Sequence, residues 1–145
     1  MSAFPTDMPA PVPDIDDAPF WAAAAQRRLV FQRCTTCGTH RHPPSPMCPR
    51  CQASGSAWSD APARGELFSY TVTHVAPHPA LRGRTPYVVA LVRFPTLDDV
   101  RLVTNIVGST PEQLKIGAAV ELVWELLGTE TYLPRFRIVS DEPAN

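Results

Sequence analysis

Hydrophobic and polar positions alternate with a period of two through the second half of the chain, from Gly65 onward. Such alternation is typical of strands that bury one face. Glycine, proline and aspartate residues separate the alternating runs and indicate turns between them. The pattern therefore predicts five strands, at Leu67–Val75, Tyr87–Phe94, Val100–Ile106, Ala119–Leu126 and Arg135–Val139.

A short helical segment is expected between the third and fourth strands. Thr110 and Gln113 have the spacing of a capping box, and Pro111 stands at the first helical position. We therefore expect a helical turn over about Pro111–Leu114. Five strands with a helix between the third and the fourth follow the element order of an OB-fold barrel.

A longer helix is predicted near the N-terminus. Asp16 and Asp17 precede Pro19, which places carboxylates at the positive end of a helix dipole and proline in the first turn. Residues 20–28 then have high helix propensity. Three residues would share one face of this helix: Trp21, Ala25 and Leu29. Residues 29–33 are expected to form a short strand.

The four cysteines form two pairs, Cys34 with Cys37 and Cys48 with Cys51, and ten residues separate the pairs. A gap of two residues lets both thiolates of a pair bind one tetrahedral centre, and Gly38 permits the close turn. The spacing predicts one closed, structural zinc site. Because all four ligands are thiolates, this site has no open position for a reactive water.

Three other interpretations of the cysteines stay open. Tetrahedral sulfur ligation also suits iron. Disulfides are the second alternative, although a chain without an export signal is expected in a reducing compartment. Two redox-active dithiols are the third, but one shared metal explains two such close pairs more simply.

Length and composition limit the architecture. The chain has 145 residues, of which 44% are hydrophobic, enough for one globular domain and a small appended module. We divide it into residues 18–62, holding the helix and the ribbon, and residues 63–141, holding the barrel. Residues 1–17 are acidic and rich in proline and are expected to be disordered or to lie along a partner, and residues 142–145 form a second tail.

Charge and hydropathy exclude several classes of protein. A net charge of -1 argues against a globally basic nucleic-acid binder or a polybasic membrane anchor. No apolar run approaches the roughly 20 residues of a membrane span. The first basic residue is Arg27, which fits neither a secretory signal nor a mitochondrial presequence. We therefore expect a cytoplasmic protein without membrane association.

No convincing catalytic constellation is present in the sequence. None of the four histidines stands in a motif with an activated serine or a free cysteine, and no glycine-rich phosphate loop occurs. His74 and His78 are the reserve candidates for acid–base work. The sequence therefore favours a chain that is not catalytic alone.

The order of motifs resembles the acyl-CoA-associated family once called domain of unknown function thirty-five (DUF35). Phe20-Trp21 comes first, then the cysteine pairs around Pro43-Pro44, then Trp58, and Gly65 before a strand with Tyr70-Thr71. The later segments Thr104–Gly108 and Ile116–Val120 fit the same family, so the resemblance spans about residues 20–140. Family members usually have arginine after the paired prolines, where this chain has Ser45.

The resemblance implies a rubredoxin-like zinc ribbon coupled to an OB fold. It also implies a non-catalytic subunit in a hetero-oligomer. Such proteins act beside thiolases, sterol-carrier-type thiolases or aldolases, and hydratases, and they complete or scaffold an active site whose chemistry belongs to the partner. An acyl-CoA thioester is therefore the implied ligand, shared with the partner enzyme.

Local charge suggests where CoA would bind. Residues 20–59 contain five arginines and no acidic residue, and four thiolates with Zn²⁺ contribute -2, which leaves about +3. Guanidinium groups bind phosphate oxygens in pairs, so these arginines either balance the thiolates or bind the CoA phosphates. Six residues are candidates for CoA or partner binding: Phe20, Trp21, Arg27, Arg28, Arg41 and Trp58. For Phe20 and Trp21, core packing is the alternative.

Two other function classes stay open. OB folds and zinc ribbons also bind single-stranded nucleic acid through basic grooves and aromatic side chains. The strand region offers Phe68, Tyr70 and several arginines, but it also carries acidic residues, so nucleic acid is not the expected partner. An independent hydrolase or redox enzyme is disfavoured by the missing catalytic constellation.

Overall fold

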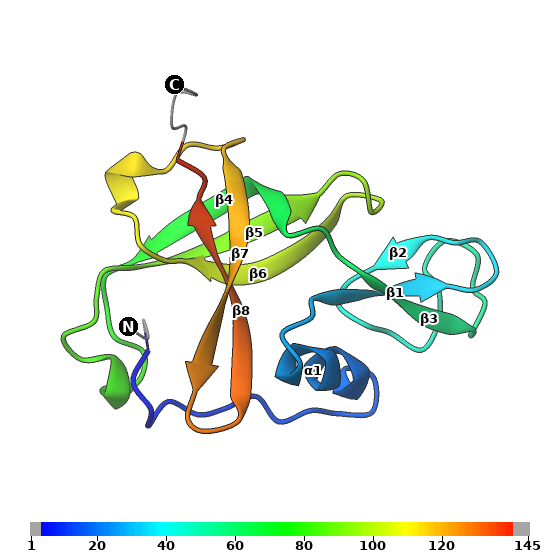
Figure 1. Cartoon of the computed structure of the whole chain (residues 1–145), viewed down its shortest axis with the longest axis horizontal. Coiled ribbons are helices and arrows are strands. Elements are labelled where there is room, and N and C mark those ends of the chain that lie inside the picture. Colours follow the sequence, from blue (N-terminus) through cyan, green and yellow to red (C-terminus); the bar gives the residue numbers. More distant parts are fainter. Residues whose placement is uncertain (1–3, 141–145) are drawn as a thin grey trace.

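The computed structural model describes residues 4–140, which form a three-stranded sheet packed beside a closed barrel (Figure 1). The small sheet has the order β2-β1-β3, and a helix, α1, contacts both the small sheet and the barrel. The bounds are α1 (Ala18–Ala25), β1 (Val30–Cys34), β2 (His40–Arg41) and β3 (Ser56–Asp60). No helix among the described residues is long and apolar enough to cross a membrane.

The five barrel strands close in the order β4-β5-β6-β8-β7. Their bounds are β4 (Arg64–Thr73), β5 (Tyr87–Phe94), β6 (Val100–Ile106), β7 (Ala119–Leu127) and β8 (Thr131–Ile138). Two short 3-10 helices complete the fold, η1 (Pro79–Leu81) after β4 and η2 (Pro111–Gln113) between β6 and β7. The predicted element order of an OB fold is therefore confirmed.

Side-chain alternation explains the barrel strands. Every second residue of β5 is buried, from Val88 to Phe94, and β6 alternates in the same way. These inward side chains meet Leu67 of β4 and Phe136 of β8 in one core. The hydrophobic positions that alternate in the sequence are therefore the ones that face the inside of the barrel.

A glycine marks the closest approach inside the barrel. A side chain at Gly65 would put its Cβ atom 2.6 Å from Val92 Cγ1 and 3.0 Å from the Arg93 carbonyl oxygen. Only glycine fits such an approach. Gly65 therefore allows the start of β4 to lie close to β5 while it pairs with β7 on its other side.

Two of the five barrel strands begin earlier than the sequence predicts. β4 begins at Arg64, three residues before the predicted start, and β8 begins at Thr131, ahead of Pro134. Proline was expected to precede the last strand because it cannot donate to a ladder. It is accommodated because β8 pairs along its length only with β7 and meets β6 at the single pair Ile106 and Phe136.

The N-terminal helix is shorter than predicted. It ends at Ala25, and Arg27 has a left-handed backbone with φ of 56°. Leu29 is therefore outside the helix, so the predicted face of Trp21, Ala25 and Leu29 is wrong. Phe20 and Ala24 are the buried helical pair instead, and Leu29 reaches the core from the segment before β1.

The N-terminal segment lies against the chain's own barrel. Phe4 is buried, with its ring edge-on to Tyr87 at 5.8 Å and the Arg135 guanidinium 4.8 Å from its centre. The amide of Phe4 donates to Glu125 Oε1 at 3.3 Å. The boundaries at residues 17 and 62, and the disorder expected before residue 17, stay predictions, and the tail at 142–145 lies outside the described residues.

Candidate metal centre and adjoining cavity

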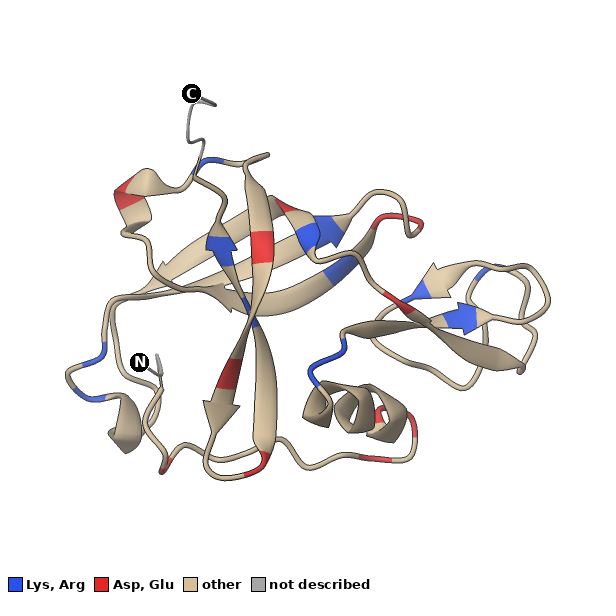
Figure 2. Ribbon diagram, in the orientation of Figure 1, with Lys and Arg blue, Asp and Glu red and all other residues tan. Residues whose placement is uncertain are grey.

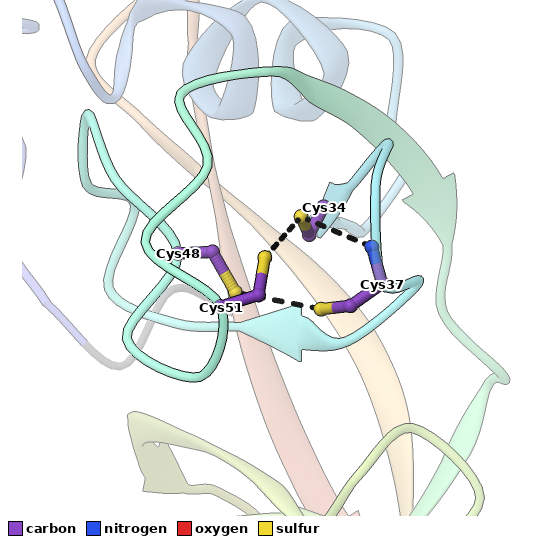
Figure 3. A group of neighbouring side chains, drawn as sticks. All are labelled: Cys34, Cys37, Cys48 and Cys51. Atoms are coloured by element: carbon purple, nitrogen blue, oxygen red, sulfur yellow. Dashed lines mark hydrogen bonds between the residues drawn. The ribbon is translucent and has the colours of Figure 1, made fainter.

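The four cysteine sulfurs gather at one end of the small sheet (Figure 3). Cys34 ends β1, Cys37 lies in the following turn, and Cys48 and Cys51 belong to the loop between β2 and β3. All four Sγ atoms lie within 4.8 Å of one another. Two of the distances between sulfurs of different pairs, Cys34 to Cys51 and Cys37 to Cys48, are both 3.6 Å.

This arrangement fits a tetrahedral zinc ion. With zinc–sulfur bonds of about 2.3 Å, the sulfurs of a regular tetrahedron lie about 3.8 Å apart. The cysteines are free thiols, and backbone amides of Thr36 and Cys37 donate to Cys34 Sγ at 3.4 and 3.5 Å. Such donors stabilise a thiolate and fix its direction. Hydrogen bonding with Thr39 lowers the pKa of Cys37 to about 6, which also favours the metal-binding form.

Two similar turns hold the cysteine pairs. In the first, the Gly38 amide donates to the Cys34 carbonyl at 3.0 Å, and in the second the Gln52 amide donates to the Cys48 carbonyl at 2.9 Å. Gly38 and Gln52 both have left-handed backbones, with φ of 76° and 64°. Glycine signals the first turn in the sequence, whereas no residue type signals the second.

The six candidates for CoA or partner binding do not form one site. Phe20 is 5% exposed and belongs to the core, and Arg41 is also 5% exposed and donates to the Ser45 carbonyl. Arg28 forms an ion pair with Asp60 at 2.8 Å, and the Arg27 guanidinium lies 5.7 Å from the centre of the Tyr132 ring. Arg27 and Arg28 are exposed, whereas Trp21 and Trp58 are half-buried against the core.

A cavity of about 310 Å³ lies between α1, the β2–β3 loop and strands β6 and β8. We call it the α1 cavity. Its apolar walls include Phe20, Trp21, Leu102 and Leu133. The sequence does not reveal it, because its residues come from four separate segments of the chain.

His42 lines the α1 cavity and contacts the rings of Phe20 and Phe31, each with centres 5.3 Å away. Burial lowers the pKa of His42 to about 4, so the ring is neutral near pH 7. Its Nδ1 atom is buried without a hydrogen-bond partner among the described residues. This histidine was not among the reserve candidates for acid–base work.

The reserve histidines do not form an acid–base site. His78 Nδ1 accepts a hydrogen bond from the Ala80 amide at 3.1 Å and so caps η1. His74 is exposed after the end of β4. Within residues 4–140, no histidine is hydrogen-bonded to a serine or cysteine side chain.

Phe68, one of the aromatic residues considered for nucleic-acid binding, contacts arginines of the chain itself. The Arg101 guanidinium lies 3.8 Å from the centre of the Phe68 ring, and the Arg93 guanidinium lies 6.0 Å from it. Arg93 and Arg101 also form ion pairs with Asp99. These groups therefore have partners within the chain, and nucleic-acid binding stays an alternative prediction without a specific supporting contact.

Comparison with known proteins resolves the family. Residues 21–56 match the model for the rubredoxin-like zinc ribbon domain of ChsH2, and residues 58–125 match the model for its C-terminal OB-fold domain. A DUF35 domain-containing scaffold protein of Methanothermobacter thermautotrophicus is 30% identical over 112 residues, which cover 76% of this chain and 82% of that protein. This chain belongs to the DUF35 family.

Two further comparisons carry functional descriptions. A solved structure described as "Ltp2-ChsH2(DUF35) aldolase" contains a chain that is 45% identical, with a TM-score of 0.80, covering 89% of this chain and 98% of that one. A probable enoyl-CoA hydratase alpha subunit of Thermomonospora curvata is 46% identical over 129 residues, 89% of this chain. This chain spans only 39% of that relative's length.

The comparisons confirm the resemblance and the predicted fold, a zinc ribbon followed by an OB barrel. The four predicted ligands form the site of a DUF35 zinc ribbon, consistent with one structural zinc ion. In this role the metal would join the two turns that hold the cysteine pairs.

Proposed function

We propose that this DUF35 protein is a non-catalytic, zinc-binding accessory subunit of an acyl-CoA enzyme of the aldolase, thiolase or hydratase type. One observation carries the proposal: nearly the whole length of the ChsH2 chain in a solved aldolase assembly aligns with this chain at 45% identity. The partner would supply the reacting groups, and this chain would supply a folded surface. We place the complex in the cytoplasm, where the thiolates stay reduced for metal binding.

The chemistry of the metal centre supports an accessory role. Four thiolates fill a tetrahedral zinc site, which leaves no position for a substrate carbonyl or an activated water. Apart from the exposed His74, the described histidines have structural positions: His42 is buried, His78 caps η1, and His40 is hydrogen-bonded to Asp98. A partner is therefore needed for bond making.

We also propose that this chain contributes to the CoA site through its accessible basic groups. Arg27 and Arg28 lie side by side at the surface between α1 and β1. Two neighbouring guanidinium groups suit the phosphates of CoA, and Trp58 offers a half-buried ring on which adenine could stack. Phe20 and Arg41 would act only through packing, because both are buried.

Co-expression with the acyl-CoA enzyme subunit encoded beside it tests the proposal. We expect the two chains to purify together and to turn over an acyl-CoA substrate that this chain alone leaves unchanged. Arg27→Ala with Arg28→Ala should raise the KM for the thioester in the complex and leave complex formation intact. Turnover by the isolated chain would refute the accessory role, and an unchanged KM would refute only the CoA contact.

A further inference from the structure

The α1 cavity has an acidic rim. Asp14, Asp16 and Asp17 line it together with the apolar walls, and Figure 2 shows these acidic positions in the chain that leads into α1. Amides of Asp17 and Asp16 donate to Asp14 at 2.9 and 2.8 Å, which lowers the pKa of Asp14. The Asp14 carboxylate is therefore charged near pH 7.

These three carboxylates form no ion pair with another described residue. Among residues 4–140, no lysine, arginine or histidine lies within ion-pair distance of them, whereas the Asp60 carboxylate beside the ribbon pairs with Arg28. The Asp17 carboxylate accepts two hydrogen bonds, one from the Trp21 ring nitrogen at 3.2 Å and one from the Asp14 amide. Three unpaired carboxylates in one place attract an external cation-bearing group.

The surface around the cavity is apolar and open. Val103 lines the cavity and is 67% exposed on the outer face of β6, beside Leu91 of β5. Ile15, between two of the rim aspartates, is 91% exposed. Exposed aliphatic side chains around an apolar cavity are typical of a protein-binding surface.

The inner wall offers hydrogen-bond donors. Arg135 lines the cavity and is half-buried, with its guanidinium 4.8 Å from the centre of the Phe4 ring. Its Nε atom is buried without a hydrogen-bond partner among the described residues. An occupant with carbonyl oxygens suits this group. A peptide provides carbonyl oxygens, an apolar side chain and a basic side chain together, whereas the CoA phosphates would be repelled by the acidic rim.

We infer that the α1 cavity, with its acidic rim, binds a segment of the partner acyl-CoA enzyme in which an apolar side chain stands next to a lysine or arginine. The apolar side chain fills the cavity between Trp21 and Leu133, and the basic side chain pairs with Asp16. This docking site rests on the proposed function, because it presumes that such a partner exists.

Charge reversal in the complex tests the site. Asp16→Lys is chosen because the Asp16 side chain makes no hydrogen bond with a described residue, so the turn held by Asp14 stays intact. Val103→Asp places a charge at the apolar mouth. Each variant should weaken the complex with the co-expressed partner by at least about tenfold. Asp16→Lys should also reduce the salt dependence of binding.

Matched controls lie outside the lining of the α1 cavity. Glu112→Lys in η2 reverses an exposed carboxylate, and Ile116→Asp replaces an aliphatic residue that is 63% exposed. Both should bind the partner as tightly as the unaltered chain. If the unaltered complex forms and neither cavity variant weakens it, the docking site is wrong while the proposed function stands. If the unaltered chain forms no complex, both are wrong.

A photo-crosslink identifies the occupant. Benzoylphenylalanine at position 103 in the full chain should crosslink to a partner segment with an apolar residue beside a lysine or arginine, and the same group at position 116 should not. Crosslinking to a second copy of this chain, or loss of the crosslink in the presence of excess acyl-CoA with the complex intact, would overturn the assignment.

Discussion

His40 in the ribbon and Asp98 in the barrel are joined by two hydrogen bonds to one carboxylate oxygen. The His40 amide and its Nδ1 atom both lie 2.9 Å from Asp98 Oδ2. Both hydrogen bonds from His40 lower the pKa of Asp98, and the bond from the backbone amide has the larger effect. The contact connects β2 to the loop between β5 and β6 and so helps to fix the ribbon against the barrel.

Removing this carboxylate should loosen the ribbon. Asp98 has a left-handed backbone with φ of 53°, so Asp98→Gly removes the side chain without backbone strain. We expect a loss of about 1–2 kcal/mol in the free energy of unfolding, measured by urea denaturation of the zinc-loaded protein. Asp99→Gly is the matched control, since its φ is 59° and its ion pairs are exposed. Equal effects of the two changes would contradict the role given to His40.

The zinc ligands should be indispensable for the ribbon. Cys48→Ser removes a ligand that is 1% exposed, and the variant should lose zinc and the structure of residues 30–60, because metal binding supplies much of the folding energy of a small module. Metal analysis by mass spectrometry and amide exchange measure the two effects. Met47→Ser, at the neighbouring exposed position, should keep both. A fully metallated and stable Cys48→Ser protein would disprove the ligand assignment.

Acidification should destabilise the protein through His42. The pKa of this histidine is lowered from 6.5 to about 4 by burial, so the unfolded chain binds a proton in this range more readily than the folded one. The stabilisation is complete above about pH 6.5 and is lost as the pH falls toward 4, by about 3 kcal/mol in all.

Thermal melts between pH 7 and pH 4 measure this dependence, with zinc content checked at each pH because thiolate protonation also releases metal. His42→Phe keeps a ring in contact with Phe20 and Phe31 and removes the titration. It should flatten the pH dependence wherever zinc stays bound. An unchanged slope in this variant would show that another group titrates.

Trp21 should matter more for binding than for folding. Its ring packs against Phe20 with centres 5.1 Å apart and lines the α1 cavity. Trp21→Ala should weaken binding of the partner or of acyl-CoA by about tenfold and leave the barrel folded, as judged by the amide spectrum of β4 to β8. Unchanged complex formation would reduce Trp21 to a packing residue.

The sequence predicts those features that depend on local patterns. The alternation of Tyr87–Phe94 gives β5 with its observed bounds, and the cysteine spacing gives the metal centre. The capping box at η2 is present as predicted, with the Thr110 amide donating to Gln113 Oε1 at 2.8 Å. In each case the residues that interact are close in the sequence or share a strand.

Features that depend on distant residues were not predicted. The contact between His40 and Asp98 spans 58 positions, and the packing of Phe4 on Tyr87 joins the N-terminus to β5. Arg41 has the sequence character of a surface phosphate ligand, yet its position in β2 buries it. No local pattern specifies which side of a two-residue strand faces inward.

Native mass spectrometry of this chain co-expressed with its acyl-CoA enzyme subunit tests the central claim most directly. The account predicts a hetero-oligomer that carries one zinc ion for each copy of this chain and turns over acyl-CoA only when both subunits are present. A folded chain that stays separate from the enzyme, lacks metal, or converts a thioester by itself would contradict it.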